Sequence, residues 1–346
     1  MLAAAVVLVV AALQASRLGE RLLSAASDPW QRPARLSETG LYDGTPPAVA
    51  GGVLPFSPQY PLWSDGASKR RWIHLPSGTA INASRGDEWE FPVGTKLWKE
   101  FAFDGRPIET RFLWLVEPGR WVFATYVWNA DGSDALLAPA GGVPRAAVVG
   151  PNRYHEIPAT DACGACHGSR SPKPLGFNAL QLSDDRDPGA IHGEPLTADM
   201  VTLRSLVRDG WLRVTRADLA DTPPRIRTRT PLARSALGYL LTNCGSCHDG
   251  TGGISVRAPA FRAADLIADG DGVARALIGR PSHWQVPGRP AGSTVLVDAE
   301  DPPMSALVKR MQSRRPSSQM PPLGTVVADT EALDVITRWI DGELAR

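Results

Sequence analysis

Residues 109–128 read ETRFLWLVEPGRWVFATYVW, and this stretch decides the fold expected for the first half of the chain. It holds two runs rich in aromatic and β-branched residues, 109–115 and 120–128, and such runs are typical of β-strands. Pro118-Gly119 lies between them, as a turn between two strands requires. Large apolar side chains occupy both odd and even positions, so we expect a hairpin that is buried on both faces.

Similar runs precede this hairpin. Residues 71–75, 88–91 and 96–101 have the same composition, and Gly-containing turn signals separate them. Short strands at this spacing predict an antiparallel β-sandwich-like domain, which we place at residues 59–158. Seven of the 11 tryptophans lie between Trp63 and Trp128. We interpret them chiefly as core residues; the alternatives are a docking surface for a partner or insulation around a cofactor.

All four cysteines fall in two copies of one motif, Cys163-Gly164-Ala165-Cys166-His167 and Cys244-Gly245-Ser246-Cys247-His248. C-x-x-C-H is typical of c-type haem attachment, in which two thiols bond to the two vinyl groups and the histidine binds the iron. The motifs therefore predict two covalently bound haem c groups. We expect Cys163, Cys166, Cys244 and Cys247 to hold the porphyrins, and His167 and His248 to bind the irons.

Two other chemistries use paired cysteines. A thioredoxin-like redox pair does not require a histidine directly after the second cysteine. A four-cysteine zinc site would bring both pairs together around one ion and would leave both histidines unexplained. The haem interpretation accounts for all six residues.

The N-terminus and the net charge indicate where the chain works. Residues 2–13 are an unbroken run of Leu, Ala and Val, which suits a secretory signal and is too short to span a bilayer. No Lys or Arg precedes the run, so residues 1–27 are either a signal peptide or a weak N-terminal anchor, and a buried core helix is the alternative. Covalent haem attachment takes place outside the bacterial cytoplasm, so we expect a periplasmic protein.

The formal charge of +1 gives no indication of nucleic-acid binding.

The second half of the chain has helical patterns. We expect helices at 198–211, with Thr197 as N-cap, and at 232–243, 305–313 and 330–344. Together with a linker at 28–58, this divides the rest of the chain into a first haem segment, 159–231, and a cytochrome domain, 232–346. The expected fold class is α+β multidomain, with the β-sandwich-like domain followed by a mainly α-helical c-type cytochrome region.

Residues 232–346 resemble class I cytochrome c. The resemblance rests on a helix containing ALGYLL (236–241), the C-x-x-C-H motif, a long loop region, the stretch QMPPLG (319–324) and a terminal amphipathic helix with Trp339. It implies that the first and last helices cross, with Gly238 allowing close approach to an aromatic such as Trp339. It also implies that Met320 is the second axial ligand, and a thioether there raises the reduction potential. Met304 and Met311 are the rival methionines.

A looser resemblance is to bacterial di-haem proteins in which a β-domain precedes two C-x-x-C-H segments. The matching stretches are YPLWSDG (60–66), FPVGT (91–95) and LGFNALQL (175–182). Between the two motifs, His192 and Met200 could serve as the sixth ligand of the first haem. We predict His192, because it lies in a Gly/Pro/Asp loop at 187–195, whereas Met200 has core spacing. A solvated loop histidine and a five-coordinate first haem are the alternatives.

These features predict an exported di-haem cytochrome that transfers electrons between a periplasmic donor, such as a dehydrogenase, and an acceptor protein. The first alternative is a di-haem peroxidase-like oxidoreductase, in which one haem has an open coordination site. The second is a binding module, in which the β-domain recognises a partner and the haems are accessory. The sixth ligand of the first haem discriminates between the carrier and the enzyme.

Overall fold

The structure is a computed structural model that describes residues 30–45, 47–84, 89–167, 174–213, 221–250 and 259–344. The chain divides into two compact units, Met1–Pro33 and Ala34–Arg346, and the second contains every element discussed below. The segment 1–27, predicted to be a signal peptide or an anchor, lies outside the described residues. Among the described residues, no helix has the length and apolar character needed to cross a membrane.

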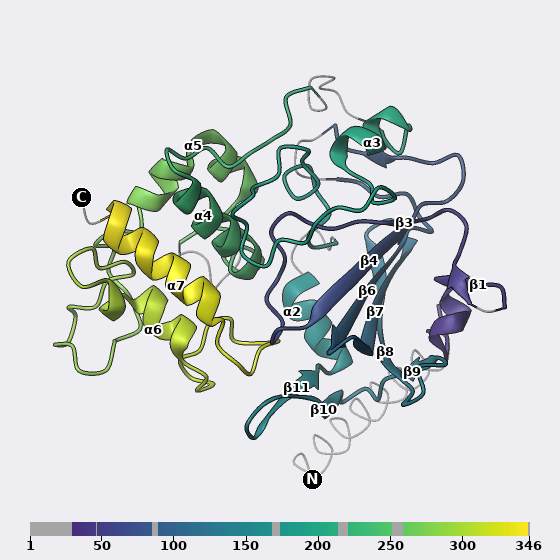
Figure 1. Cartoon of the computed structure of the whole chain (residues 1–346), viewed down its shortest axis with the longest axis horizontal. Helices are drawn as coiled ribbons and strands as arrows, with labels where there is room; N and C mark the ends of the chain where they lie inside the picture. Colours follow the sequence, from purple (N-terminus) through teal and green to yellow (C-terminus); the bar gives the residue numbers. More distant parts are fainter. Residues whose placement is uncertain are drawn as a thin grey trace, which may run out of the picture. The chain divides into compact units, whose positions relative to one another are not determined.

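A six-stranded antiparallel sheet forms the centre of the first half, with strand order β3-β4-β6-β7-β8-β9 (Figure 1). The hairpin predicted from residues 109–128 is its longest part, and Phe112 pairs with Ala124 across it. The bounds of the strands are Val53–Pro55 (β3), Ser68–His74 (β4), Lys96–Phe103 (β6), Arg106–Glu117 (β7), Arg120–Trp128 (β8) and Ala135–Leu137 (β9).

The even-numbered residues of the central strands face a core formed with the N-terminal part of the unit. Trp72, Trp98 and Phe112 pack there with Leu36 and Leu41, which are fully buried. The indole N–H of Trp98 donates to Thr39 Oγ1 at 2.9 Å, so this buried polar group is satisfied. Part of the segment predicted to be a linker, 28–58, therefore packs on the sheet. It contributes the 3-10 turn η1 (Leu36–Thr39) and the short strands β1 (Tyr42–Asp43) and β2 (Ala48–Val49).

The odd-numbered residues face the other way, as the two-residue period of a strand requires. At one end of the sheet, Ile73 and Leu97 pack against Phe177, Leu203 and Leu206 from the chain beyond the first motif. That region contains helix α3 (Leu203–Arg208) and strand β12 (Leu212–Arg213), which pairs in parallel with β5 (Ile81–Asn82). Strands β10 (Val143–Gly150) and β11 (Arg153–Ile157) form a separate hairpin that leads to the first motif.

The last third of the chain packs short helices around a second core. Leu237 and Leu240 of α4 are fully buried with Ile336 and Trp339 of α7, and Figure 1 shows these two helices crossing. The bounds are Pro231–Asn243 (α4), Ala263–Arg275 (α5), Pro302–Met304 (η4), Ala306–Gln312 (α6), Thr330–Trp339 (α7) and the π-helical turn Ile340–Leu344 (η5).

The predicted fold class is wrong. The six described α-helices are short, none exceeds 13 residues, and the structure is dominated by the β-rich part rather than by a mainly α-helical cytochrome region. Five prolines between α5 and α6 explain part of the difference, because proline lacks the N–H that a helix interior needs. The sandwich is also absent from the described residues: one sheet is covered by loops and short elements on both faces.

Two predicted details of the helices need correction. The helix predicted at 198–211 begins only after Thr202, whose hydroxyl accepts from Ser205 N, so Thr197 is not its N-cap. Helices α4 and α7 pack together, yet Gly238 accommodates Tyr60 rather than Trp339. A Cβ at position 238 would lie 2.1 Å from Cε1 of Tyr60, which explains why only glycine fits there.

Candidate cofactor site between the two C-x-x-C-H motifs

The first motif is itself a helical turn. Helix α2 comprises Cys163–His167 and follows the 3-10 turn η2 (Thr160–Ala162). Residues three apart on a helix lie on one face, so this turn presents Cys163 and Cys166 on the same side, with His167 one residue further. The His167 ring also contacts the ring of Phe123 on β8, with centroids 5.3 Å apart.

The second motif turns in the same way at the end of α4. The Thr230 hydroxyl accepts from Ala233 N and Pro231 follows it, a combination that starts the helix. After Asn243, the His248 N–H donates to the Cys244 carbonyl at 2.8 Å. This bond closes a turn over residues 244–248, although Cys244 itself, with φ −121° and ψ −36°, has left the helical conformation.

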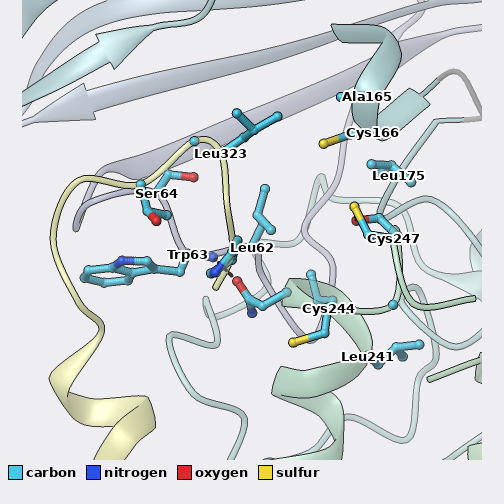
Figure 2. A pocket seen from close by; sticks show the side chains of 18 of the residues that line it. Leu62, Trp63, Ser64, Ala165, Cys166, Leu175, Leu241, Cys244, Cys247 and Leu323 are labelled. Atoms are coloured by element: carbon cyan, nitrogen blue, oxygen red, sulfur yellow. Dashed lines mark hydrogen bonds between the residues drawn. The ribbon is translucent and has the colours of Figure 1, made fainter. Parts of the chain in front are cut away.

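One large cavity brings the two motifs together. Its volume is about 1290 Å³, larger than the roughly 300–1,000 Å³ of common small-ligand pockets. In Figure 2 the sulfur atoms of Cys166 and Cys247 approach each other from different elements, while Cys244 lies further along the wall beside Leu241. The cavity is lined by all four cysteines, by His167 and His248, by Met320 and by many apolar side chains.

The thiols are in a poorly solvated environment. Burial, followed by the neighbouring Cys247, raises the pKa of the Cys244 thiol to about 12. Burial also raises the pKa of Cys166, and Cys247 adds to this effect while Arg111 opposes it. Cys247 therefore acts both on Cys244 of its own motif and on Cys166 of the first motif, and the second effect agrees with the approach of the two sulfur atoms in Figure 2.

His248 and Met320 have features that fit iron ligands. Burial, followed by Arg310, lowers the pKa of His248, which favours the neutral imidazole that binds metals. The Pro259 backbone interacts with the ring and opposes this shift without outweighing it. Met320 lines the cavity, and its N–H donates to the Arg310 carbonyl at 3.0 Å. Of the rival methionines, Met304 lies outside the cavity lining, whereas Met311 also lines the cavity but is 5% exposed and packs in the helical core.

The structure does not bring His192 to this cavity. Its Nε2 lies 2.8 Å from Asp329 Oδ2, and its Nδ1 lies 3.5 Å from Glu331 Oε2. The ring also packs on the indole of Trp63, with centroids 4.9 Å apart. Both ring nitrogens are therefore engaged with carboxylates at the start of α7, so the predicted role of His192 as an iron ligand would require these contacts to break.

A zinc site, the alternative interpretation of the cysteines, requires several ligand side chains that lie close together. Among the described residues, which include all four cysteines and both motif histidines, no three His, Cys, Asp or Glu side chains form a group that could hold one metal ion. The zinc interpretation needs such a group. The residues present fit haem c better, because two separate C-x-x-C-H turns face one large, mostly apolar cavity.

A buried network of hydrogen-bonded side chains beside the cavity was not predicted from the sequence. His155 is 1% exposed; its Nδ1 lies 2.9 Å from Asp65 Oδ2 and its Nε2 lies 3.2 Å from Glu109 Oε1. Glu109 in turn accepts two hydrogen bonds from Arg111, at 2.7 and 3.1 Å. The other oxygen of Asp65 accepts from Val326 N and Val327 N, at 2.7 and 3.0 Å. The sequence signals were the stretch 60–66, which carries part of the resemblance to di-haem proteins, and His155 itself, which closely precedes the first motif.

Comparisons with protein-family models, with curated proteins and with solved structures give no match for this chain. The function is therefore argued from its residues.

Stability should depend on the protonation of His155. Burial lowers the pKa of His155, but Asp65 and Glu109 outweigh burial and raise it above the usual value. A raised folded-state pKa stabilises the protein fully below the unfolded pKa of about 6.5, and this contribution is lost as pH rises through the folded value. The difference in unfolding free energy between wild type and His155→Gln should therefore be largest in acid and shrink above about pH 6.5. Urea unfolding at several pH values measures it.

The exposed His283 supplies the control, since His283→Gln should leave the pH dependence unchanged. A His155→Gln difference that is flat across pH 5 to 8 would show that His155 stays in one protonation state.

Proposed function

We propose that this chain is an exported di-haem c-type cytochrome that transfers electrons between a periplasmic donor and an acceptor protein. The observation that carries the proposal is the single cavity lined by both C-x-x-C-H turns and by Met320. Haem c would supply reversible one-electron exchange at its iron. Cys163, Cys166, Cys244 and Cys247 would hold the two groups covalently, with His167 and His248 as proximal ligands.

In this proposal the surrounding residues exclude water from the cavity, present Met320 and hold the loop that carries it. Apolar side chains such as Phe177 and Phe261, which are 2% and 3% exposed, exclude water from the cavity and so influence the potential. The loop at 316–327 presents Met320. It is held by Asp65, which accepts from the amides of residues 326 and 327, and by the Trp63 indole N–H, which donates to the Val327 carbonyl at 3.1 Å.

The second candidate function is the peroxidase-like oxidoreductase. The observation in its favour is the engagement of His192 with Asp329 and Glu331, away from the cavity. A first haem without a protein ligand on its second side would have an open coordination site. The donor protein stays a prediction under either function.

Covalent attachment is the first test. Full-length protein isolated from a periplasmic expression host should exceed the mass of its polypeptide by two haem groups, even after denaturation. The variant in which Cys163 and Cys166 are both changed to Ala should carry one group. Two groups on that variant, or none on wild type, would remove the basis of the proposal.

Met320→Ala tests the ligand assignment at the second motif. We expect a lower midpoint potential and loss of the weak long-wavelength band of thioether-ligated ferric haem, because methionine ligation raises the potential. Met304→Ala is the matched control and should leave both unchanged, since Met304 is not among the cavity-lining residues. An unaltered spectrum in Met320→Ala would exclude Met320 as the ligand.

His192→Ala separates the two candidate functions. From the contacts of His192 we expect lower stability, by about 1–3 kcal/mol for a lost hydrogen bond to a carboxylate, and no change in the optical spectrum or in peroxide turnover. If the spectrum changes and peroxide turnover appears only in the variant, His192 is a ligand after all and the carrier function gains. Peroxide turnover in wild type, unaltered in His192→Ala, would favour the enzyme.

A further inference from the structure

Three cationic side chains form one row across the sheet. The register pairs Arg71 of β4 with Lys99 of β6, and Lys99 with Arg111 of β7. Residues directly opposite each other on neighbouring strands project from the same face, with Cβ atoms about 4.5–5.5 Å apart, and like charges in such pairs are destabilising. A row of three cations therefore needs a compensating negative charge.

The carboxylates beside the row compensate it only in part. Glu194 Oε2 lies 2.7 Å from Arg71 Nη1, and Glu109 accepts both hydrogen bonds from Arg111. Lys99 has no hydrogen bond or ion pair within the described part of the chain, and its ammonium lies 4.7 Å from the centroid of the Phe101 ring. The two carboxylates thus pair with Arg71 and Arg111, while Lys99 has no such partner among the described residues and Lys69 of β4 adds a further cation to this face.

Arg71 provides a second, independent indication. Its side chain is 5% exposed, and its Nη2 is buried with no hydrogen-bond partner in the described residues. A buried donor without a partner costs about 1–3 kcal/mol. Burial, followed by Arg71, Lys69 and Arg111, also lowers the pKa of Lys99 well below its usual value, and Glu109 opposes this shift without outweighing it.

The row faces the cavity described above. Arg71, Lys99 and Arg111 all belong to its lining, on the wall formed by the sheet. Arg111 interacts electrostatically with Cys163 and Cys166, so the row lies on the side of the first motif. The free Nη2 of Arg71 and the ammonium of Lys99 can each donate a charge-assisted hydrogen bond to a carboxylate oxygen.

We propose that Arg71, Lys99 and Arg111 form a carboxylate-binding site on the sheet wall of the cavity. The carboxylate has two sources: a propionate side chain of the haem at the first motif, which rests on the proposed function, or a free small carboxylate. In both cases the row would bind through Lys99 and the unpartnered Nη2 of Arg71.

Lys99→Met tests the site through the sign of its effect on stability. If the row binds no anion, removing Lys99 relieves like-charge repulsion and the melting temperature of the full chain should rise or stay constant. If a carboxylate is bound, the melting temperature should fall, by about 2–4 °C. Far-ultraviolet circular dichroism follows the melting, so the measurement does not depend on haem absorption. Lys99→Arg, which keeps the charge, should retain most of the stability.

Arg106→Gln is the matched control, because Arg106 is an exposed cation on the same strand as Arg111. It should leave the melting temperature unchanged. The mass of each sample, measured separately, shows whether haem is attached, so a failure of the proposed function is distinguished from a failure of this site.

Added ligand and a haem-free chain distinguish the two sources. If the carboxylate is free, sodium propionate should raise the melting temperature of wild type but not of Lys99→Met, relative to sodium chloride at equal ionic strength. If the carboxylate belongs to haem, sodium propionate should leave the melting temperature unchanged. Lys99→Met should then lower the melting temperature of the haem-carrying protein, but not that of a haem-free chain in which all four cysteines are changed to Ser. A Lys99→Met chain as stable as wild type, or equally destabilised in both forms with no propionate effect, would overturn the proposal.

Discussion

Asp65 joins three parts of the chain that are distant in sequence. One carboxylate oxygen accepts hydrogen bonds from the amides of residues 326 and 327, and the other lies 2.9 Å from Nδ1 of His155 in the middle of β11. The residue has φ of 54° and is 6% exposed, a backbone conformation that non-glycine residues adopt mainly where surrounding contacts fix it. The placement of the Met320 loop beside the sheet depends on this one carboxylate.

The residues before Asp65 extend the same connection. Tyr60 packs in the helical core against Gly238, and the Trp63 N–H donates to the Asn243 side chain directly before the second motif. Residues 60–66 therefore belong to the helical core by their packing, although they lead directly into β4 of the sheet. A boundary drawn at residue 158 separates parts that are held together by buried hydrogen bonds.

Local features of the sequence predicted local structure well. The aromatic and β-branched runs in residues 109–128 predicted strands β7 and β8, and the helix predicted at 232–243 matches the start of α4 within one residue. Long-range packing could not be predicted in this way. An apolar strand face can be covered equally by a second sheet or by loops, so the sandwich was wrong. His192 was assigned from its loop, but its contact with Asp329 spans 137 residues and leaves no local signal.

The same long-range contacts bear on the role of the β-rich part. The loop that carries Met320 contains several prolines and no described helix or strand, and local turns and the Arg310 carbonyl satisfy only part of its backbone groups. Asp65 and Trp63 supply the missing partners from outside the helical region. The sheet itself contributes Arg71, Lys99 and Arg111 to the cavity wall. A β-rich part that both anchors the Met320 loop and lines the cavity is part of the candidate site, which argues against its being a separable binding module.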